Sequence, residues 1–178
     1  PNMELFKTSL ATLTGGSGAV AVLLADRELT EGRRRIVGGV TRNAVQHHRL
    51  CRWGQDSAGA TPGEDAMETH AVEVLANGVA LGAETWRAFT QELGWVDGVD
   101  KSICHQVGKS NREAFLGALR IAPERDYATY PYLGNIGTVS LPITAALAEE
   151  REFLEPGDKV GFLGIGSGLN CLMLGVEW

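Results

Sequence analysis

Strand-length apolar runs alternate with amphipathic helical patterns along most of this 178-residue chain. The runs at residues 18–24, 35–42 and 99–105 predict strands, and the first has the composition of a strand covered on both faces. Apolar residues at helical spacing predict a long helix within residues 66–94 and a second helix after residue 110. Strands that alternate with helices predict an α/β layered domain.

The C-terminal part predicts an adjacent pair of strands. Residues 141–150 have a helical composition in which Pro142 is tolerated only within the first turn. Strands predicted at residues 159–163 and 169–176 then flank a glycine-rich stretch at residues 164–168. Because a short connection cannot return the chain for parallel pairing, at least one pairing in the sheet is expected to be antiparallel.

Three local patterns predict finer details. Residues 47–65 contain several glycines and few aliphatic side chains, which predicts a long loop with a functional or interfacial role. A break is expected in the long helix within residues 77–82, because glycines interrupt the pattern there. Ser110 and Glu113 have the spacing of a capping box, and the helix that they begin should end before Pro123.

The charge balance excludes several partners. A net charge of -6 and a pI near 5.2 argue against nucleic acid or an anionic membrane as the main partner, since both bind clustered positive charge. Only residues 33–35 form a basic run, which is interpreted as a solvated turn; contact with the phosphates of a carrier is the alternative. No signal peptide or membrane span is visible, because the apolar run at residues 19–25 is too short to cross a bilayer.

The chain has three cysteines, Cys51, Cys104 and Cys171. They lack the paired spacing of a disulfide framework and fit a reducing cytoplasm. His47, His48 and Cys51 are potential zinc ligands, but a closed site needs four donors and no second pair stands nearby, so no metal site is predicted. Cys104 and His105 are neighbours on a predicted strand and should point to opposite faces, which makes them a poor nucleophile–base pair.

His105 and Asn135 are the candidate catalytic residues. His105 lies at a predicted strand-to-helix junction, where α/β sheets usually place ligand-handling groups, and Asn135 lies between glycines at the entry to the next helix. Each also has a purely structural interpretation: a histidine bonded at a helix start, and an asparagine that turns or caps the chain. Together, two neutral donors at successive sheet ends could converge on one carbonyl oxygen and stabilise its developing negative charge.

The glycine-rich stretch at residues 164–168 does not fit a nucleotide site. A dinucleotide site or a P-loop needs a helix after the glycines to present its N-terminus to phosphate, whereas only a strand-like segment ending at Trp178 follows here. The glycines are interpreted instead as exposing backbone N–H groups or admitting a substrate closely, and a plain tight hairpin is the alternative.

Three motifs in this order resemble the C-terminal half of the ketoacyl synthase III-like enzymes of the thiolase superfamily. They are Cys104-His105-Gln106-Val107-Gly108, Gly134-Asn135-Ile136-Gly137 and Gly164-Ile165-Gly166-Ser167-Gly168-Leu169-Asn170-Cys171. The chain is most similar to the branch that condenses acyl-CoA thioesters at the start of bacterial olefin and β-lactone synthesis. The resemblance implies a thiolase-like fold, with residues 1–30 as the end of the N-terminal half and residues 31–178 as the C-terminal βαβαβαββ half.

The resemblance implies a Cys-His-Asn triad for carbon–carbon bond formation. His105 and Asn135 match the histidine and the asparagine, and Ser167 and Gly168 match the loop that faces the reacting thioester. The nucleophilic cysteine of such enzymes starts a buried helix in the N-terminal half, so an N-terminal half or companion subunit is expected to supply it. None of the three cysteines of this chain matches it.

The implied reaction is a non-decarboxylating Claisen condensation of two long-chain acyl-CoA thioesters to a 2-alkyl-3-oxoacyl thioester. Acyl-CoA, or an acyl carrier, is then the substrate, and no cofactor is implied. The family also implies a homodimer or heterodimer of the thiolase type. Because the chain opens at Pro1 without an initiator methionine, it is expected to begin in the middle of a domain. By the resemblance, the strand at residues 18–24 belongs to a sheet whose other strands are absent from this sequence, so the chain is not expected to fold on its own.

Two departures separate the chain from the fatty-acid-synthesis subfamily. That subfamily typically has an asparagine soon after its His-Gln pair and a serine after Gly-Asn-Thr, whereas this chain has Val107-Gly108 and Ile136-Gly137 there. The departures favour the non-decarboxylating reaction. A decarboxylating 3-oxoacyl synthase III that uses a malonyl thioester is the first alternative, and a non-catalytic acyl-binding or regulatory subunit is the second.

Overall fold

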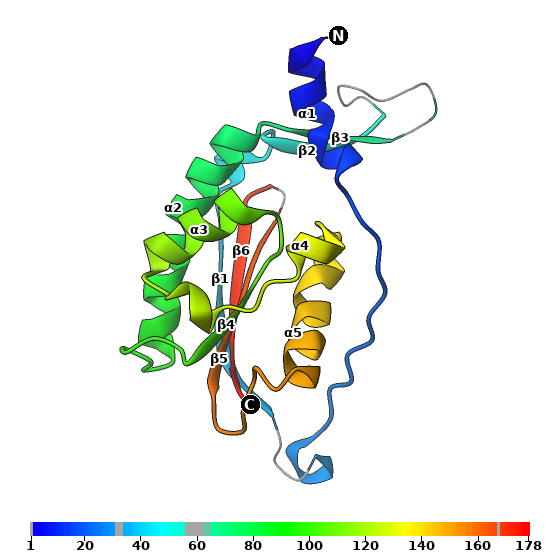
Figure 1. The fold of residues 1–178 in the computed structure, drawn as a ribbon. Coiled ribbons are helices and arrows are strands. Elements are labelled where there is room, and N and C mark those ends of the chain that lie inside the picture. Colours follow the sequence, from blue (N-terminus) through cyan, green and yellow to red (C-terminus); the bar gives the residue numbers. More distant parts are fainter. Residues whose placement is uncertain (1, 31–33, 56–62, 64, 167) are drawn as a thin grey trace.

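The computed structural model describes residues 2–30, 34–55, 63, 65–166 and 168–178. Its centre is a four-stranded sheet in the order β1-β6-β5-β4 (Figure 1). These strands are β1 (Arg35–Asn43), β4 (Lys101–Cys104), β5 (Lys159–Gly166) and β6 (Asn170–Glu177). β6 pairs antiparallel with both β1 and β5, whereas β5 pairs parallel with β4. The predicted antiparallel pairing of the two closing strands is confirmed.

Helices cover both faces of this sheet (Figure 1). α2 (Ala71–Glu92) and α3 (Lys109–Leu119) lie on one face, and α5 (Ser140–Glu150) lies on the other. Because side chains alternate along a strand, Ile103 of β4 packs in the cluster beside α5, while Cys104 packs in the cluster beside α2 and α3. The predicted α/β layered fold is confirmed.

A small hairpin lies beyond one end of the main sheet. β2 (Cys51–Gly54) pairs antiparallel with β3 (Ala66–Thr69), and the Arg52 guanidinium lies 2.6 Å from the Glu68 carboxylate across the ladder. The loop predicted over residues 47–65 is therefore wrong for β2. A four-residue strand with a polar cross-strand pair has no alternating apolar pattern for sequence reasoning to detect. Residues 56–62 and 64 lie outside the described part of the chain.

The N-terminal helix α1 (Met3–Leu13) packs on this hairpin (Figure 1). The Thr12 hydroxyl accepts a hydrogen bond from the Met67 N–H at 2.8 Å and donates one to the Met67 carbonyl at 3.1 Å. These bonds occupy backbone groups of β3 that its partner strand does not use, so α1 closes one edge of the hairpin.

α2 runs without the predicted break. Its glycines are close-approach positions: a Cβ on Gly82 would lie 2.2 Å from the Phe115 ring of α3, and one on Gly78 would lie 3.2 Å from the Ile165 side chain. Glycine therefore lets α3 and the sheet approach the helix, and packing outweighs its low helix propensity. The helix also begins at Ala71 rather than near residue 66, because residues 66–69 form β3.

The predicted capping box is wrong. α3 begins at Lys109, directly after Gly108, so Ser110 lies inside the first turn and makes no capping bond. Glu113 lies instead one turn after Lys109, with 3.8 Å between the charged groups. The C-terminal end is as predicted: Arg120 adopts a left-handed φ of 57°, and the chain leaves the helix before Pro123.

Residues 18–24 do not form the predicted strand. They run as an extended segment alongside α5 (Figure 1), and no strand of the described residues pairs with them. A Cβ on Gly18 would lie 3.0 Å from the Ile143 side chain of α5, but Leu23 is 90% exposed. The composition predicts a strand, whereas strand formation also needs a neighbouring backbone, which this chain does not provide in its described part.

The basic run forms ion pairs in its described part. Arg34 contacts the Glu149 carboxylate of α5. The Arg34 guanidinium also lies over the Trp178 ring, 4.5 Å from the ring centre. The Arg35 guanidinium lies 2.6 Å from the Glu177 carboxylate. Both pairs are exposed, so they fit the solvated interpretation better than a phosphate site. Arg33 lies outside the described residues.

The remaining described elements are short. They are α4 (Tyr130–Leu133) and the 3-10 turns Arg27–Leu29, Val45–His47, Pro123–Arg125 and Gly137–Val139. None of the described helices combines the length and the apolar character needed to cross a bilayer.

Candidate active site

His105 follows the last residue of β4. Its backbone N–H donates a hydrogen bond to the Leu163 carbonyl at 3.0 Å, which continues the ladder to β5 and fixes its position. The ring points to the α5 side of the sheet, where Nδ1 lies 2.9 Å from the Ser140 hydroxyl. Cys104, its neighbour, packs on the other face, so the two side chains diverge as expected for successive strand residues.

Asn135 lies in the turn after α4 and is held from two sides. Its backbone carbonyl accepts a hydrogen bond from the Gly16 N–H at 2.9 Å, and its side-chain Oδ1 accepts one from the Gly137 N–H at 3.0 Å. Because Oδ1 is occupied in this way, the amide Nδ2 is the group left to donate. Gly137 has a φ of 66°, a conformation that favours glycine.

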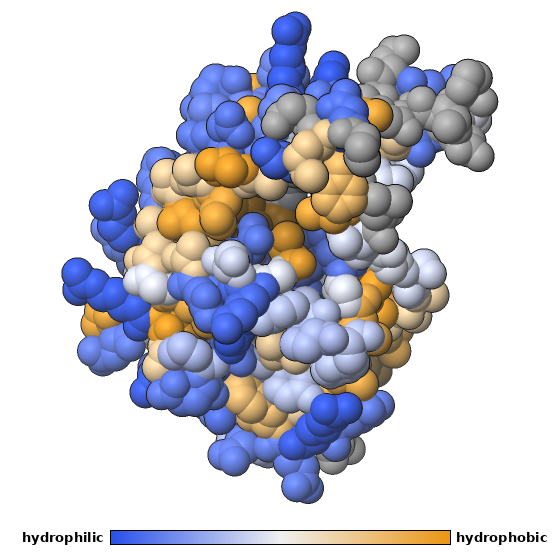
Figure 2. Space-filling view, turned by 45° about the horizontal axis from the view of Figure 1, so that its top comes forward, coloured by the Kyte–Doolittle hydropathy of each residue, from blue (hydrophilic) through white to orange (hydrophobic). Residues whose placement is uncertain are grey.

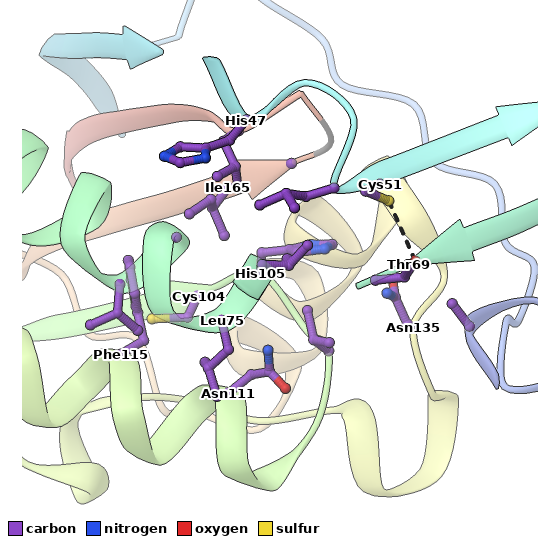
Figure 3. Close-up of a pocket in the computed structure, with 18 of the residues that line it drawn as sticks. His47, Cys51, Thr69, Leu75, Cys104, His105, Asn111, Phe115, Asn135 and Ile165 are labelled. Carbon is purple, nitrogen blue, oxygen red and sulfur yellow. Dashed lines mark hydrogen bonds between the residues drawn. The ribbon is translucent and has the colours of Figure 1, made fainter. Parts of the chain in front are cut away.

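A chain of hydrogen bonds connects the two residues. The Ser140 hydroxyl that contacts His105 donates to the Gly137 carbonyl at 2.8 Å, and the Gly137 N–H holds Asn135. His105 and Asn135 also line the same pocket (Figure 3). The structure thus brings them together, and their catalytic roles stay predictions.

Gln106 ties the two sides of this site together. It is 2% exposed, and its amide nitrogen donates to the Cys104 carbonyl at 2.7 Å. Its Oε1 accepts hydrogen bonds from the Thr129 and Tyr130 N–H groups at 2.9 and 3.1 Å. The residue after His105 therefore positions the segment that leads to Asn135. Sequence reasoning quoted Gln106 in a motif but assigned it no role, because the two N–H groups that bond to its Oε1 lie more than twenty residues away.

A buried ion pair supports the same segment. The Arg112 Nε of α3 lies 2.6 Å from the Asp126 carboxylate, whose other oxygen accepts hydrogen bonds from the Ser102 hydroxyl at 3.0 Å and the Cys104 N–H at 3.2 Å. Burial raises the pKa of Asp126, and the bond to Arg112 opposes that rise. β4, α3 and the chain after α3 are thereby locked together. The sequence contains no local signal for this pair.

The pocket is mainly apolar. Its lining includes Leu50, Met67, Val74, Leu75, Val79, Phe115, Leu163, Ile165 and Leu169 (Figure 3). In the space-filling view, hydrophobic residues gather beside a hollow on the face turned forward (Figure 2). An apolar wall with a few convergent polar groups is typical of a site for a small, largely apolar ligand.

The electrostatics of the site follow from burial. Burial lowers the pKa of His105, so the ring is neutral near pH 7. Burial also raises the pKa of the Cys104 thiol well above its usual value and raises that of Cys171. Because the thiolate is the nucleophile, neither buried cysteine is suited to attack a thioester. Cys51, on the pocket lining, has its Sγ 3.5 Å from the Thr69 hydroxyl.

The glycine-rich turn joins β5 to β6 as a hairpin, and Gly168 lines the pocket with a φ of 71°. The hairpin interpretation is confirmed, and Gly168 lies on the pocket lining; its role toward a substrate stays a prediction. Ser167 lies outside the described residues. Within the described part of the chain, no three His, Cys, Asp or Glu side chains gather as a metal site would require.

Comparison with known proteins shows which proteins this fold and site resemble. Residues 94–178 match the family model described as 3-Oxoacyl-[acyl-carrier-protein (ACP)] synthase III C terminal. This part of the chain is therefore similar to the C-terminal domain of ketoacyl synthase III-like enzymes.

Its full length is similar to proteins named acyl-CoA:acyl-CoA alkyltransferase. The protein of Shewanella oneidensis is 54% identical over 182 residues, covering 100% of this chain and 52% of the relative. The protein of Xanthomonas campestris is 38% identical over 176 residues, covering 98% of this chain and 49% of the relative.

A solved structure has the same fold. A Cys-to-Ser variant of Xanthomonas campestris OleA with bound lauric acid and lauroyl-CoA superposes with a TM-score of 0.89 at 37% identity, covering 100% of this chain and 50% of that protein. The predicted thiolase-like fold is confirmed. The chain spans about half the length of the relatives it matches.

Proposed function

We propose that this chain supplies the histidine and asparagine of a non-decarboxylating Claisen condensation, in which two long-chain acyl-CoA thioesters give a 2-alkyl-3-oxoacyl thioester. The observation that carries the proposal is the position of His105 and Asn135 on one apolar pocket, joined through Ser140 and Gly137. Similarity along the whole chain to acyl-CoA:acyl-CoA alkyltransferases supports the choice of substrate.

The first acyl group is held as a thioester on a cysteine that a partner segment supplies. Covalent capture divides a difficult condensation into two easier steps. The apolar lining around Leu75, Val79 and Phe115 suits the alkyl chain of such a substrate. The raised thiol pKa values of Cys104 and Cys171 support a nucleophile outside this chain.

The second acyl thioester then becomes the carbon nucleophile. Loss of its α-proton, to a base that we place in the partner segment, puts negative charge on the thioester oxygen. Asn135 donates to that oxygen from Nδ2, and His105 donates from Nε2 once its ring is protonated. The backbone N–H of Gly168 helps to stabilise the oxyanion on the cysteine-bound acyl group, and Ser167 orders that turn.

The proposed assembly follows from the same family. Residues 1–30 complete an N-terminal thiolase half that carries the cysteine, and residues 31–178 form the C-terminal half. The complete unit is a homodimer or heterodimer of the thiolase type that works in the cytoplasm and begins olefin biosynthesis. The half-length match to the relatives supports this arrangement.

Two rival functions can be distinguished from the proposed one by their products. A decarboxylating 3-oxoacyl synthase III would take a malonyl thioester, and the matched family model supports it for residues 94–178. A non-catalytic acyl-binding subunit would make no product and has no need of the bond chain between His105 and Asn135. Product analysis with malonyl-CoA plus one acyl-CoA, against two acyl-CoAs, separates the three functions.

The mechanism is tested in the assembled protein with His105→Ala and Asn135→Ala. Each should lower condensation by about 100-fold to 1,000-fold, as expected for loss of one oxyanion donor. Intact mass spectrometry should show that acyl transfer to the cysteine persists in Asn135→Ala and partly in His105→Ala. The control is His48→Ala, since that ring lies 3.0 Å from the Val45 carbonyl through Nδ1 and is not part of the pocket lining. Equal loss of the acyl-enzyme in both site variants would show that His105 and Asn135 act in acyl transfer rather than in condensation.

A further inference from the structure

The Ser140 hydroxyl stands between the His105 ring and the Gly137 carbonyl. Its oxygen lies 2.9 Å from Nδ1 of His105 and 2.8 Å from the carbonyl oxygen of Gly137. A hydroxyl has one proton and a carbonyl oxygen can only accept, so the proton of Ser140 goes to Gly137. The Ser140 oxygen is then an acceptor toward the ring. Nδ1 of His105 must therefore carry a proton for both contacts to be hydrogen bonds.

Burial allows these two hydrogen bonds to determine the tautomer of the His105 ring. Ser140 is 1% exposed, so water does not replace either bond. Burial lowers the pKa of His105, so the ring is neutral near pH 7 and carries a single proton, which the two bonds of Ser140 place on Nδ1.

The other ring nitrogen is left free. Nε2 then has a lone pair, and within the described residues no side chain or backbone group bonds to it. The other titratable groups on the pocket lining are His47, Cys51, Cys104 and Arg112. None of them makes a hydrogen bond or ion pair with the His105 ring in the described part of the chain.

We propose that Ser140 is a positioning residue that holds neutral His105 in the Nδ1–H tautomer, so that Nε2 meets the pocket as a proton acceptor. This makes the two site residues unequal: the Asn135 amide is a ready donor, whereas His105 becomes one only after it gains a proton. A tautomer is set by the bond that the other ring nitrogen makes, and here that bond is to Ser140.

The consequence for catalysis rests on the proposed function. Nε2 takes the proton of the partner's cysteine thiol while the sulfur forms a bond to the acyl carbon and CoA leaves as its thiolate. The S–H and C–S(CoA) bonds break, and an N–H and a new C–S bond form. The resulting imidazolium has N–H groups on both nitrogens, so it keeps Ser140 as acceptor through Nδ1 and donates to the next thioester oxygen through Nε2.

The tautomer is measured directly by long-range proton–nitrogen NMR correlation on the assembled protein labelled with ¹⁵N-histidine, at neutral pH. The His105 signal is the one lost in His105→Gln. We expect a protonated Nδ1 and an unprotonated Nε2. A neutral ring with its proton on Nε2 overturns the proposal, and this reading needs no enzymatic activity.

Three variants test whether Ser140 is the cause. Ser140→Ala should move the proton to Nε2, because Nδ1 loses its acceptor, and should slow acyl-enzyme formation by about 100-fold, the lower range for positioned proton transfer. Ser140→Thr keeps the hydroxyl and should keep both the tautomer and the rate. Thr144→Val removes a different buried hydroxyl of α5, one turn after Ser140, whose oxygen lies 2.6 Å from the Thr129 hydroxyl. This variant should leave the tautomer and the acylation rate unchanged.

The outcomes separate the two claims. An unchanged tautomer in Ser140→Ala, or the same change in Thr144→Val, overturns the role of Ser140. The expected tautomer together with no condensation product in the unaltered protein sinks the proposed function and leaves the positioning role standing. A shifted tautomer with an unaltered acylation rate overturns the proposed proton transfer.

Discussion

Val160 and Leu163 of β5 are fully buried, whereas Leu23, in a run of similar composition, is 90% exposed. The first two belong to the sheet domain, meaning the described residues from 34 to 178, and Leu23 belongs to the N-terminal segment, residues 14–26. β5 has a strand on each side, while the segment, within the described residues, forms a single isolated β-bridge, between Gly15 and Asn135. The difference shows that composition makes a residue apolar, and neighbours make it part of a core.

The N-terminal segment nevertheless reaches the candidate active site. A Cβ on Gly16 would lie 2.8 Å from the Leu133 carbonyl and 2.7 Å from the Ile136 side chain, so only glycine allows this close approach. The Gly16 N–H also holds the Asn135 carbonyl. The segment therefore contributes position rather than burial, and substitutions in the two regions should have effects of very different size.

The largest effect is expected at the buried ion pair of the sheet domain. Arg112→Ala leaves the buried Asp126 carboxylate without its cation and should lower the free energy of unfolding by about 3–5 kcal/mol. The matched control is Arg42→Ala, whose exposed pair with Glu84 is worth about 0–1 kcal/mol. Denaturant unfolding measures both. Equal effects would show that burial does not distinguish the two pairs.

The Arg112→Ala penalty should also depend on pH. Removing the guanidinium raises the pKa of Asp126 further above its unfolded value, so the folded variant binds a proton that the unfolded chain has lost. A raised folded pKa gives stability that is present at low pH and is lost as pH rises through it. The gap between Arg112→Ala and the unaltered protein should therefore be smaller in mildly acidic than in neutral solution.

A smaller effect is expected at the α2–α3 contact. Gly82→Ala places a Cβ against the Phe115 ring and should cost about 1–3 kcal/mol by overpacking, against a gain in helix propensity of about 1 kcal/mol. Gly117→Ala, on the exposed face of α3 where nothing lies within 4 Å, should show that gain alone. Thermal unfolding compares the two variants. A Gly82→Ala variant as stable as Gly117→Ala would mean that α3 shifts to accommodate the added Cβ without loss of stability.

The same contrast explains what could be predicted from the sequence. β5, β6 and α5 were predictable because their apolar patterns match elements with buried residues in this chain. The strand predicted at residues 18–24 was wrong because a local apolar pattern does not reveal whether a neighbouring strand is present to pair with it. The predicted break in α2 was wrong for the opposite reason. Helix propensity treats Gly82 in isolation, whereas the close approach of the Phe115 ring is what requires glycine there.

The candidate site divides in the same way. His105, Asn135 and Gly168 were identifiable as motif residues at the ends of elements, and the structure places all three on one pocket. Ser140 was not identifiable, because a serine at the start of a helix is ordinarily a capping residue. Its contact with His105 spans 35 residues, and only the fold brings the two together.

The smallest effect is expected in the N-terminal segment. Leu23→Ser removes an apolar side chain that is already in solvent, so it should change the free energy of unfolding by less than about 0.5 kcal/mol. Leu163→Ala in β5 is the contrasting variant and should cost about 2–5 kcal/mol, because it opens a cavity in the core. Chemical unfolding at several protein concentrations distinguishes packing from association. If a partner segment covers residues 18–24, Leu23→Ser should weaken that association. The unfolding midpoint should then rise less with protein concentration than in the unaltered protein, because binding stabilises by mass action. A loss comparable to that of Leu163→Ala, independent of concentration, would mean that Leu23 packs within its own chain, and the contrast between the two regions would not hold.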